Sequence, residues 1–275
     1  MAFVSDGRTL IAHAYHHHYT IPAFNVCSAE MIRACIETAA AEAAPVILQS
    51  YPADIEQLAP RQLVALVRSY AAETGVPVAL HMDHGQGFDM DLACLRAGYS
   101  SVMYDGADRP LEEVIATTRK IAEVAHAQGA ALEVAAESFN AGMVEFTRPQ
   151  DARRLREEGR ADMVAVSVGS EHGHRGSLRL ELLREIAEAV QGPLVLHGGS
   201  GIPVADYQVA RQLGVVKANI GSALYRALRR VWEGSADAAN HREVYQRARA
   251  ALMEVAREKL RMMGASGQAA TFDTR

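Results

Sequence analysis

The chain has 275 residues, of which 49% are hydrophobic and 22% are charged, and its formal net charge is −5. This length can bury a large core, in one domain or two small ones, and a mildly acidic chain without a basic run argues against nucleic-acid binding as the main function. The apolar stretches are well short of the ~18 residues that a membrane span needs, and the N-terminus lacks the layout of a signal peptide.

Short apolar runs rich in Val, Ile and Leu alternate with longer segments of helical periodicity along the whole chain. The runs lie at 22–26, 45–49, 77–83, 101–105, 131–136, 162–168, 193–197 and 215–220. Strands that are apolar on both faces are typical of a parallel sheet covered by helices, and segments such as 28–43 and 110–129 have the periodicity of such helices. The second opens with Pro and acidic residues and closes on a Gly, as a capped helix does.

Eight strand–helix units in this length predict an α/β fold, a single (β/α)8 TIM barrel over residues 1–275. The alternative is an open doubly wound sheet, which rarely has eight evenly spaced units. We expect residues 222–262 to form a C-terminal helical extension and residues from about 263 to 275 to form a loose tail. The three cysteines are odd in number and lack metal-site spacing, so free thiols in a reducing cytoplasm are expected.

Polar residues interrupt the apolar pattern where the predicted strands end. In a barrel of this kind, side chains at the carboxyl ends of the strands converge on the active site. Three imidazoles that leave one coordination position open are a catalytic zinc arrangement. The polar residues at or just after the predicted strand ends are Asp83, His84, Asp105, His172, His197 and Asn219.

Other histidines are expected to have structural roles. His81 precedes Asp83 by two residues, so it projects to the same side of its strand but one layer deeper, where it would orient a ligand rather than bind metal. The histidines at 16–18 precede the first strand and are expected in a solvated turn at the opposite end of the barrel.

Two glycine-rich stretches suggest a phosphate site. They lie at 197–201 and 219–222, after the seventh and eighth strands, where barrels often hold phosphate between backbone N–H groups and the start of a helix. The hydroxyls of Ser200 and Ser222 can add donors to each loop.

The motifs "PAFNV", "APVILQ", "LHMDHG", "SVMYDG", "EHG", "LVLHGGSG" and "KANIGS" resemble those of the class II, metal-dependent ketose-bisphosphate aldolases, a family that includes fructose- and tagatose-bisphosphate aldolases. The resemblance covers nearly the whole chain. It implies a lyase that reversibly converts a ketose (bis)phosphate into dihydroxyacetone phosphate and an aldehyde through a zinc-stabilised enediolate. It also implies a homodimer or homotetramer, with a monovalent cation near the phosphate loops.

The resemblance assigns roles to individual residues. His84, His172 and His197 would bind Zn2+ or another divalent metal, and Asp83 would be the acid/base at the aldehyde-derived oxygen. Gly85 is expected to leave space for the substrate. The dihydroxyacetone phosphate would be held by Asn25, Gly173, Gly198, Gly199, Ser200, Asn219 and Ser222.

Two departures from the family pattern concern the aldehyde end of the substrate. After the fifth strand the usual second glutamate is replaced by Ala135. The sequence therefore offers three candidates for the acid that protonates the enediolate, Glu133, Glu137 and Glu145. A serine of the family is replaced by Tyr51, which narrows that side of the pocket. Both changes suggest an unusual substrate, including one without a second phosphate.

Two other functions compete with the aldolase hypothesis. The same fold and metal could catalyse a retro-aldol or isomerisation reaction on a sugar-acid phosphate, which the loss of the usual strand-five acid favours. The chain could also be a non-catalytic sugar-phosphate-binding protein, although binding alone does not need the proton-transferring Asp83.

Overall fold

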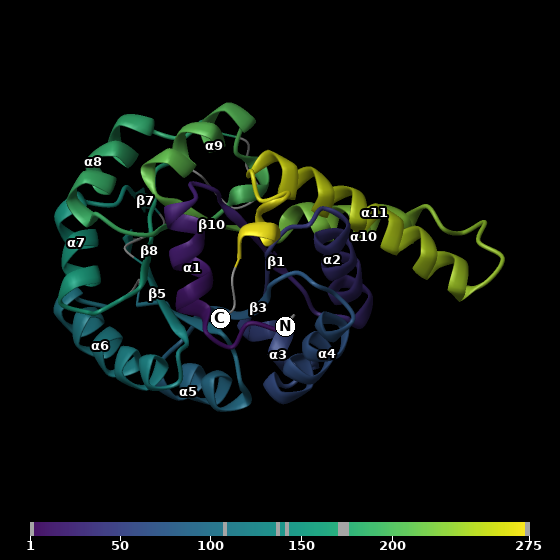
Figure 1. Ribbon diagram of the computed structural model, residues 1–275, viewed down its shortest axis with the longest axis horizontal. Helices are drawn as coiled ribbons and strands as arrows, with labels where there is room; N and C mark the ends of the chain where they lie inside the picture. Colours follow the sequence, from purple (N-terminus) through teal and green to yellow (C-terminus); the bar gives the residue numbers. More distant parts are fainter. Residues whose placement is uncertain (1–2, 107–108, 136–137, 141–142, 170–175, 273–275) are drawn as a thin grey trace.

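Eight parallel strands close into a barrel in the order β1-β10-β9-β8-β5-β4-β3-β2 (Figure 1). The structure is a computed structural model that describes residues 3–106, 109–135, 138–140, 143–169 and 176–272. Closure confirms the predicted (β/α)8 barrel and excludes the open doubly wound sheet, which has two unpaired edges. The strands of the barrel are β1 (Ile21–Asn25), β2 (Val46–Ser50), β3 (Val78–Gly85), β4 (Ser101–Tyr104), β5 (Ala131–Ala135), β8 (Met163–Ala165), β9 (Leu194–Leu196) and β10 (Val215–Ile220).

Helices cover most of the outside of the barrel, where their apolar stripes pack on the strands. Local signals set their ends: Ser28 caps α2 by accepting a hydrogen bond from the Met31 N–H, and Gly98 ends α5 in a left-handed conformation. The helices after the first are α2 (Ala29–Ala41), α3 (Pro52–Gln57), α4 (Pro60–Ala72), α5 (Phe88–Ala97), α6 (Leu111–Ala127), α7 (Pro149–Glu157), α8 (Leu180–Val190), α9 (Val204–Ala210), α10 (Ser222–Glu233) and α11 (His241–Met262), and β6 (Ser138–Asn140) pairs with β7 (Met143–Glu145) in an antiparallel hairpin.

The amino ends of the strands are covered by α1 (Gly7–His16). The segment before it pairs with the first residue of β3, where the Val4 N–H donates to the Val78 carbonyl at 2.8 Å. His16 ends α1, and His17 and His18 form the turn after it; all three are exposed, as predicted. Because α1 covers the amino ends, a site in the barrel is expected at the opposite mouth, where the strands have their carboxyl ends.

The predicted helical extension consists of two helices, α10 and α11, which project from the barrel in Figure 1. The expected loose tail is wrong for residues 263–272. Met263 and Ala265 are buried, a short 3-10 helix spans Gln268–Thr271, and the Gly267 and Ala269 N–H groups donate to carbonyls of Glu42 and Ala43. This segment is therefore packed against the residues that follow α2.

Within the described ranges, no helix combines the length and apolar character that crossing a bilayer requires.

Candidate active site

Asp83 and His84 are consecutive residues of β3, and both contribute to the site at the carboxyl end of the barrel. Neighbouring residues in a regular strand point to opposite faces, so the two side chains could not otherwise lie together. The pairing of β3 with β4 shifts register between Met82 and Gly85, and His84 adopts a left-handed backbone conformation with φ of 58°. A non-glycine residue in this region is strained, and such strain is found where a site requires a particular side-chain direction.

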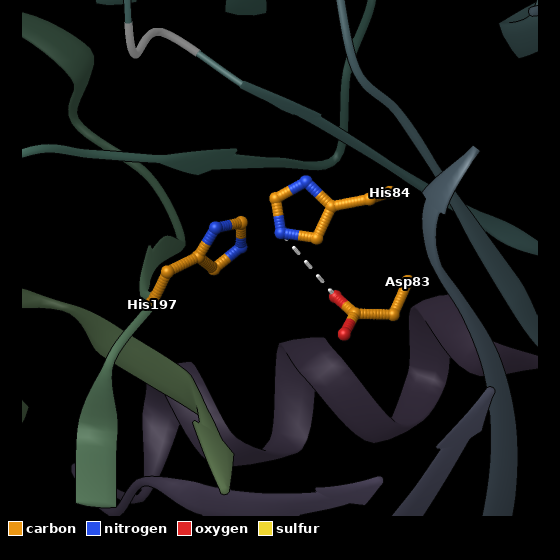
Figure 2. Close-up of side chains that lie close together, drawn as sticks. All are labelled: Asp83, His84 and His197. Carbon is orange, nitrogen blue, oxygen red and sulfur yellow. Dashed lines mark ion pairs between the residues drawn. The ribbon is translucent and has the colours of Figure 1, made fainter. Parts of the chain in front are cut away.

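His84 and His197 face one another across the mouth of the barrel, as Figure 2 shows, with ring centroids 4.7 Å apart. Each imidazole has a carboxylate partner: His84 Nδ1 lies 2.6 Å from Asp105 Oδ2, and His197 Nε2 lies 3.0 Å from Glu133 Oε1. Carboxylates in this position fix the orientation of metal-binding histidines.

One potential ligand atom from each of Asp83, His84 and His197 lies within 4.8 Å of the others. The two oriented imidazoles are donors that fit a divalent transition metal, and the Asp83 carboxylate lies beside them. His172, the third predicted imidazole, lies outside the described residues.

Amide groups hold the Asp83 carboxylate. Asn25 Nδ2 and Gln49 Nε2 donate to its Oδ2 at 2.8 and 3.0 Å, and Asn219 Nδ2 donates to its Oδ1 at 2.8 Å. Burial by itself raises the pKa of Asp83, but the charges of His84, Lys217 and His197 and the Asn25 hydrogen bond lower it below its usual value. The side chain is thus ionised, fixed in direction and able to accept a proton.

A buried ionic network lies below these residues in the barrel interior. Lys217 Nζ is 2.9 Å from Glu133 Oε2 and 2.6 Å from Asn219 Oδ1, so it connects the partner of His197 to a partner of Asp83. Burial raises the pKa of Glu133, but Lys217 and the His197 hydrogen bond lower it well below its usual range. His81 is fully buried beside this network, where burial lowers its pKa to about 3, so its ring is neutral.

The loops after β9 and β10 meet at one side of the site. Gly198 has a φ of 67°, and a Cβ on Gly199 would lie 2.7 Å from the Tyr207 hydroxyl, so both positions require glycine. The Ala223 N–H, in the first turn of α10, donates to Ser200 Oγ at 3.3 Å, and the buried Lys259 Nζ lies 3.5 Å from the Ser200 carbonyl oxygen. The N–H groups in the first turn of α10 therefore point toward this loop, and such a helix start is suited to binding an anion.

A cavity of about 600 Å³ opens over these groups. Predicted site residues that line it are Asn25, Asp83, His84, Gly198, Ser200, Asn219 and Ser222, and Gly199 is buried in the loop beside it. Gly173 and Glu137 lie outside the described residues, as does the side chain of Glu145.

The expectation that Gly85 leaves space for the substrate is wrong. A Cβ at this position would clash with the Asp91 carboxylate and would lie 2.7 Å from the Met103 carbonyl oxygen, so the absent side chain makes room for α5 and β4.

Several residues of the site had no role in the sequence analysis. Gln49 is polar at the end of a predicted strand and so had the same signal as Asn25. Tyr225 lines the cavity from α10, and Asp54 from α3, without any strand-end signal. Asp105 was recognised as a strand end, but its pairing with His84 depends on the register of β3 and β4.

Comparisons with known proteins agree with this geometry. The family profile described as "Fructose-bisphosphate aldolase class-II" matches residues 5–268. A curated relative, the D-tagatose-1,6-bisphosphate aldolase subunit GatY of Klebsiella oxytoca, is 31% identical over 97% of this chain and 99% of its own.

Solved structures extend the likeness to three dimensions. The YdjI aldolase from Escherichia coli K12 superposes with a TM-score of 0.87 at 30% identity, over 97% of this chain and 99% of its own. A putative fructose-1,6-bisphosphate aldolase from Coccidioides immitis gives a TM-score of 0.86 at 26% identity, over 95% and 97%. The profile match over nearly the whole chain, together with these relatives, shows that the protein belongs to the class II fructose-bisphosphate aldolase family and is an aldolase, a carbon–carbon lyase.

Proposed function

We propose that this aldolase reversibly cleaves a ketose phosphate into dihydroxyacetone phosphate and an aldehyde, and that it does so with a bound divalent metal, zinc in the first instance. The observation that carries the proposal is the content of one cavity. An ionised carboxylate held by three amides, two carboxylate-oriented imidazoles and two glycine loops at a helix start all border the same space.

His84 and His197 would hold the metal, with His172 as the expected third ligand. When bound, the metal would polarise the substrate carbonyl and stabilise the negative charge that appears as the C3–C4 bond breaks. Glu133 is fully buried and paired with Lys217, so we assign it to orienting His197 rather than to protonating the substrate.

Asp83 would take the proton of the C4 hydroxyl while the C3–C4 electron pair stays on C3, which turns C4 into an aldehyde carbon. The three amides that donate to this carboxylate hold it in one orientation. The N–H groups of Gly198, Gly199 and Ser200 and the start of α10 at Ser222 would hold the phosphate of the three-carbon product. Protonation of C3 is then left to Glu137 or Glu145.

A second candidate reaction, retro-aldol cleavage or isomerisation of a sugar-acid phosphate at the same metal, is favoured by Ala135 at the end of β5, where the family has an acid. The two candidates predict different products from the same assay.

The test is to measure the metal content of the purified protein and then its products from a panel of ketose phosphates, with and without a chelator. Release of dihydroxyacetone phosphate that is lost with chelator and restored by zinc supports the first candidate. Release of another carbon fragment supports the second. Chelator-independent cleavage would contradict both.

We further propose a homodimer or homotetramer in the cytoplasm, with a monovalent cation near the phosphate loops. The relative from Klebsiella oxytoca is named as a subunit, the α10–α11 arm projects from the barrel, and all three cysteines are free thiols. Light scattering of the purified protein tests the oligomer.

A further inference from the structure

The two ends of the cavity differ in charge. At one end lie the glycine loop after β9 and the start of α10, which favour an anion. The ammonium of Lys259 lies behind this loop, 3.5 Å from the Ser200 carbonyl oxygen and 3.0 Å from Glu258 Oε1. The other end is formed by the turn between β2 and α3 and by the rim of α10. Among the described residues that line the cavity there is no lysine or arginine, whereas three of them are aspartates, Asp54, Asp83 and Asp105.

Asp54 is held rigidly at this acidic end. It is the third residue of α3, and its Oδ2 accepts a hydrogen bond from the Tyr51 N–H at 2.8 Å, which closes the first turn of the helix. Burial, followed by the charge of Asp83, raises the pKa of Asp54. A second negative group brought into this space would be repelled by the same carboxylates, and the partial burial of Asp54 reduces the screening of that repulsion.

Two tyrosines complete this end of the cavity. The Tyr51 ring lies edge-on to the His84 ring with centroids 5.7 Å apart, so it borders the place where the reacting carbons would sit. Tyr225 lines the cavity from α10, and burial, together with the nearby Asp54 carboxylate, raises the pKa of its hydroxyl, which is therefore neutral. Neutral hydroxyl donors beside a fixed carboxylate are suited to binding sugar hydroxyls, and they offer no compensation for a phosphate dianion.

We propose that the aldehyde half of the substrate carries no phosphate and is an uncharged polyhydroxy aldehyde, whose hydroxyls bind Asp54, Tyr51 and Tyr225. The enzyme is then selective for a ketose monophosphate and disfavours a bisphosphate. This inference rests on the proposed function, since it assumes that dihydroxyacetone phosphate occupies the other end of the cavity. Selectivity here comes from a repulsive group as much as from attractive contacts.

The test is the condensation reaction with dihydroxyacetone phosphate and matched pairs of aldehydes, glyceraldehyde against glyceraldehyde 3-phosphate and erythrose against erythrose 4-phosphate. We expect kcat/KM to be at least about tenfold higher for the uncharged member of each pair, the effect of roughly one unfavourable charge contact. Equal or better turnover of the phosphate esters would overturn this inference while leaving the proposed function intact. Absence of condensation with all four aldehydes would overturn the proposed function and this inference with it.

A pair of variants identifies the residue responsible. Asp54→Asn removes the charge but keeps an oxygen that can accept from the Tyr51 N–H, so α3 keeps its cap. We expect it to raise kcat/KM for the phosphate esters relative to their uncharged partners by about tenfold. Glu56→Gln, which removes an exposed charge from the same helix outside the cavity lining, is the control and should leave the ratio unchanged. An equal change of the ratio in both variants, or none in Asp54→Asn, would overturn the assignment of Asp54.

Discussion

Asp91 is a fully buried carboxylic acid in α5, and neither of its oxygens has a hydrogen-bond partner among the described residues. It packs against Gly85 at the end of the strand that carries Asp83 and His84. Burial raises its pKa from 3.8 to about 8. We predict that Asp91→Asn, which replaces the acid with a neutral group of the same shape, stabilises the protein at pH 8 relative to the parent much more than at pH 5.

The sign and size follow from proton linkage. Between pH 4 and pH 8 the unfolded chain has released the Asp91 proton while the folded chain retains it, so the parent loses stability as the pH rises through this window. Each pH unit within the window corresponds to about 1.4 kcal/mol. The difference in unfolding free energy between variant and parent should therefore increase by about 4 kcal/mol over the three pH units from pH 5 to pH 8.

Urea unfolding followed by circular dichroism, on parent and variant at both pH values and at one metal concentration, measures this difference. The comparison at each pH cancels the contribution of the other titrating groups. Asp89→Asn changes an exposed acid in the first turn of the same helix and should show no such trend. A variant-minus-parent difference that is the same at pH 5 and pH 8 would refute the reasoning and would mean that the Asp91 site is hydrated.

Three further predictions concern the proposed chemistry. Asp83→Ala should retain bound metal but lose cleavage by about 10²–10⁴-fold, because it removes the proton acceptor, and an activity within tenfold of the parent would refute the assigned role. Asp105→Asn should weaken metal binding by about 10–100-fold in a chelator competition titration, since the His84 ring loses its orienting carboxylate, and unchanged affinity would count against that pairing. Lys259→Met should raise KM for dihydroxyacetone phosphate in condensation while KM for the aldehyde stays constant, because the ammonium lies beside the Ser200 carbonyl at the phosphate end; a rise in both would indicate a general loss of structure.

Local pattern was sufficient to predict the barrel and the mouth that carries the site. Strands buried on both faces must be apolar throughout, so a polar residue at the end of such a run, as at Asn25, Asp83 and Asn219, marks the place where the strand leaves the core. The same rule overlooked Gln49, which has an equivalent position at the end of β2 and donates to the same carboxylate.

The ordered packing of the last ten described residues could not be read from their composition of small, polar and glycine residues. Their order comes from hydrogen bonds to carbonyls at the end of α2, more than 200 positions earlier in the chain. A local sequence pattern does not indicate hydrogen-bond partners that are so distant in the chain, and the segment was therefore predicted to be a loose tail.

The chain by itself determined the fold class, the family and the end of the barrel at which the candidate site lies, because these depend on periodicity and on short motifs within single segments. Only the tertiary structure decided that Asp83 and His84 line the same cavity, that Lys217 joins Glu133 to Asn219, and that Asp54 makes one end of the cavity acidic. Each of these depends on strand register or on the packing of distant segments, which bring together groups whose charges and hydrogen bonds matter only at contact distance.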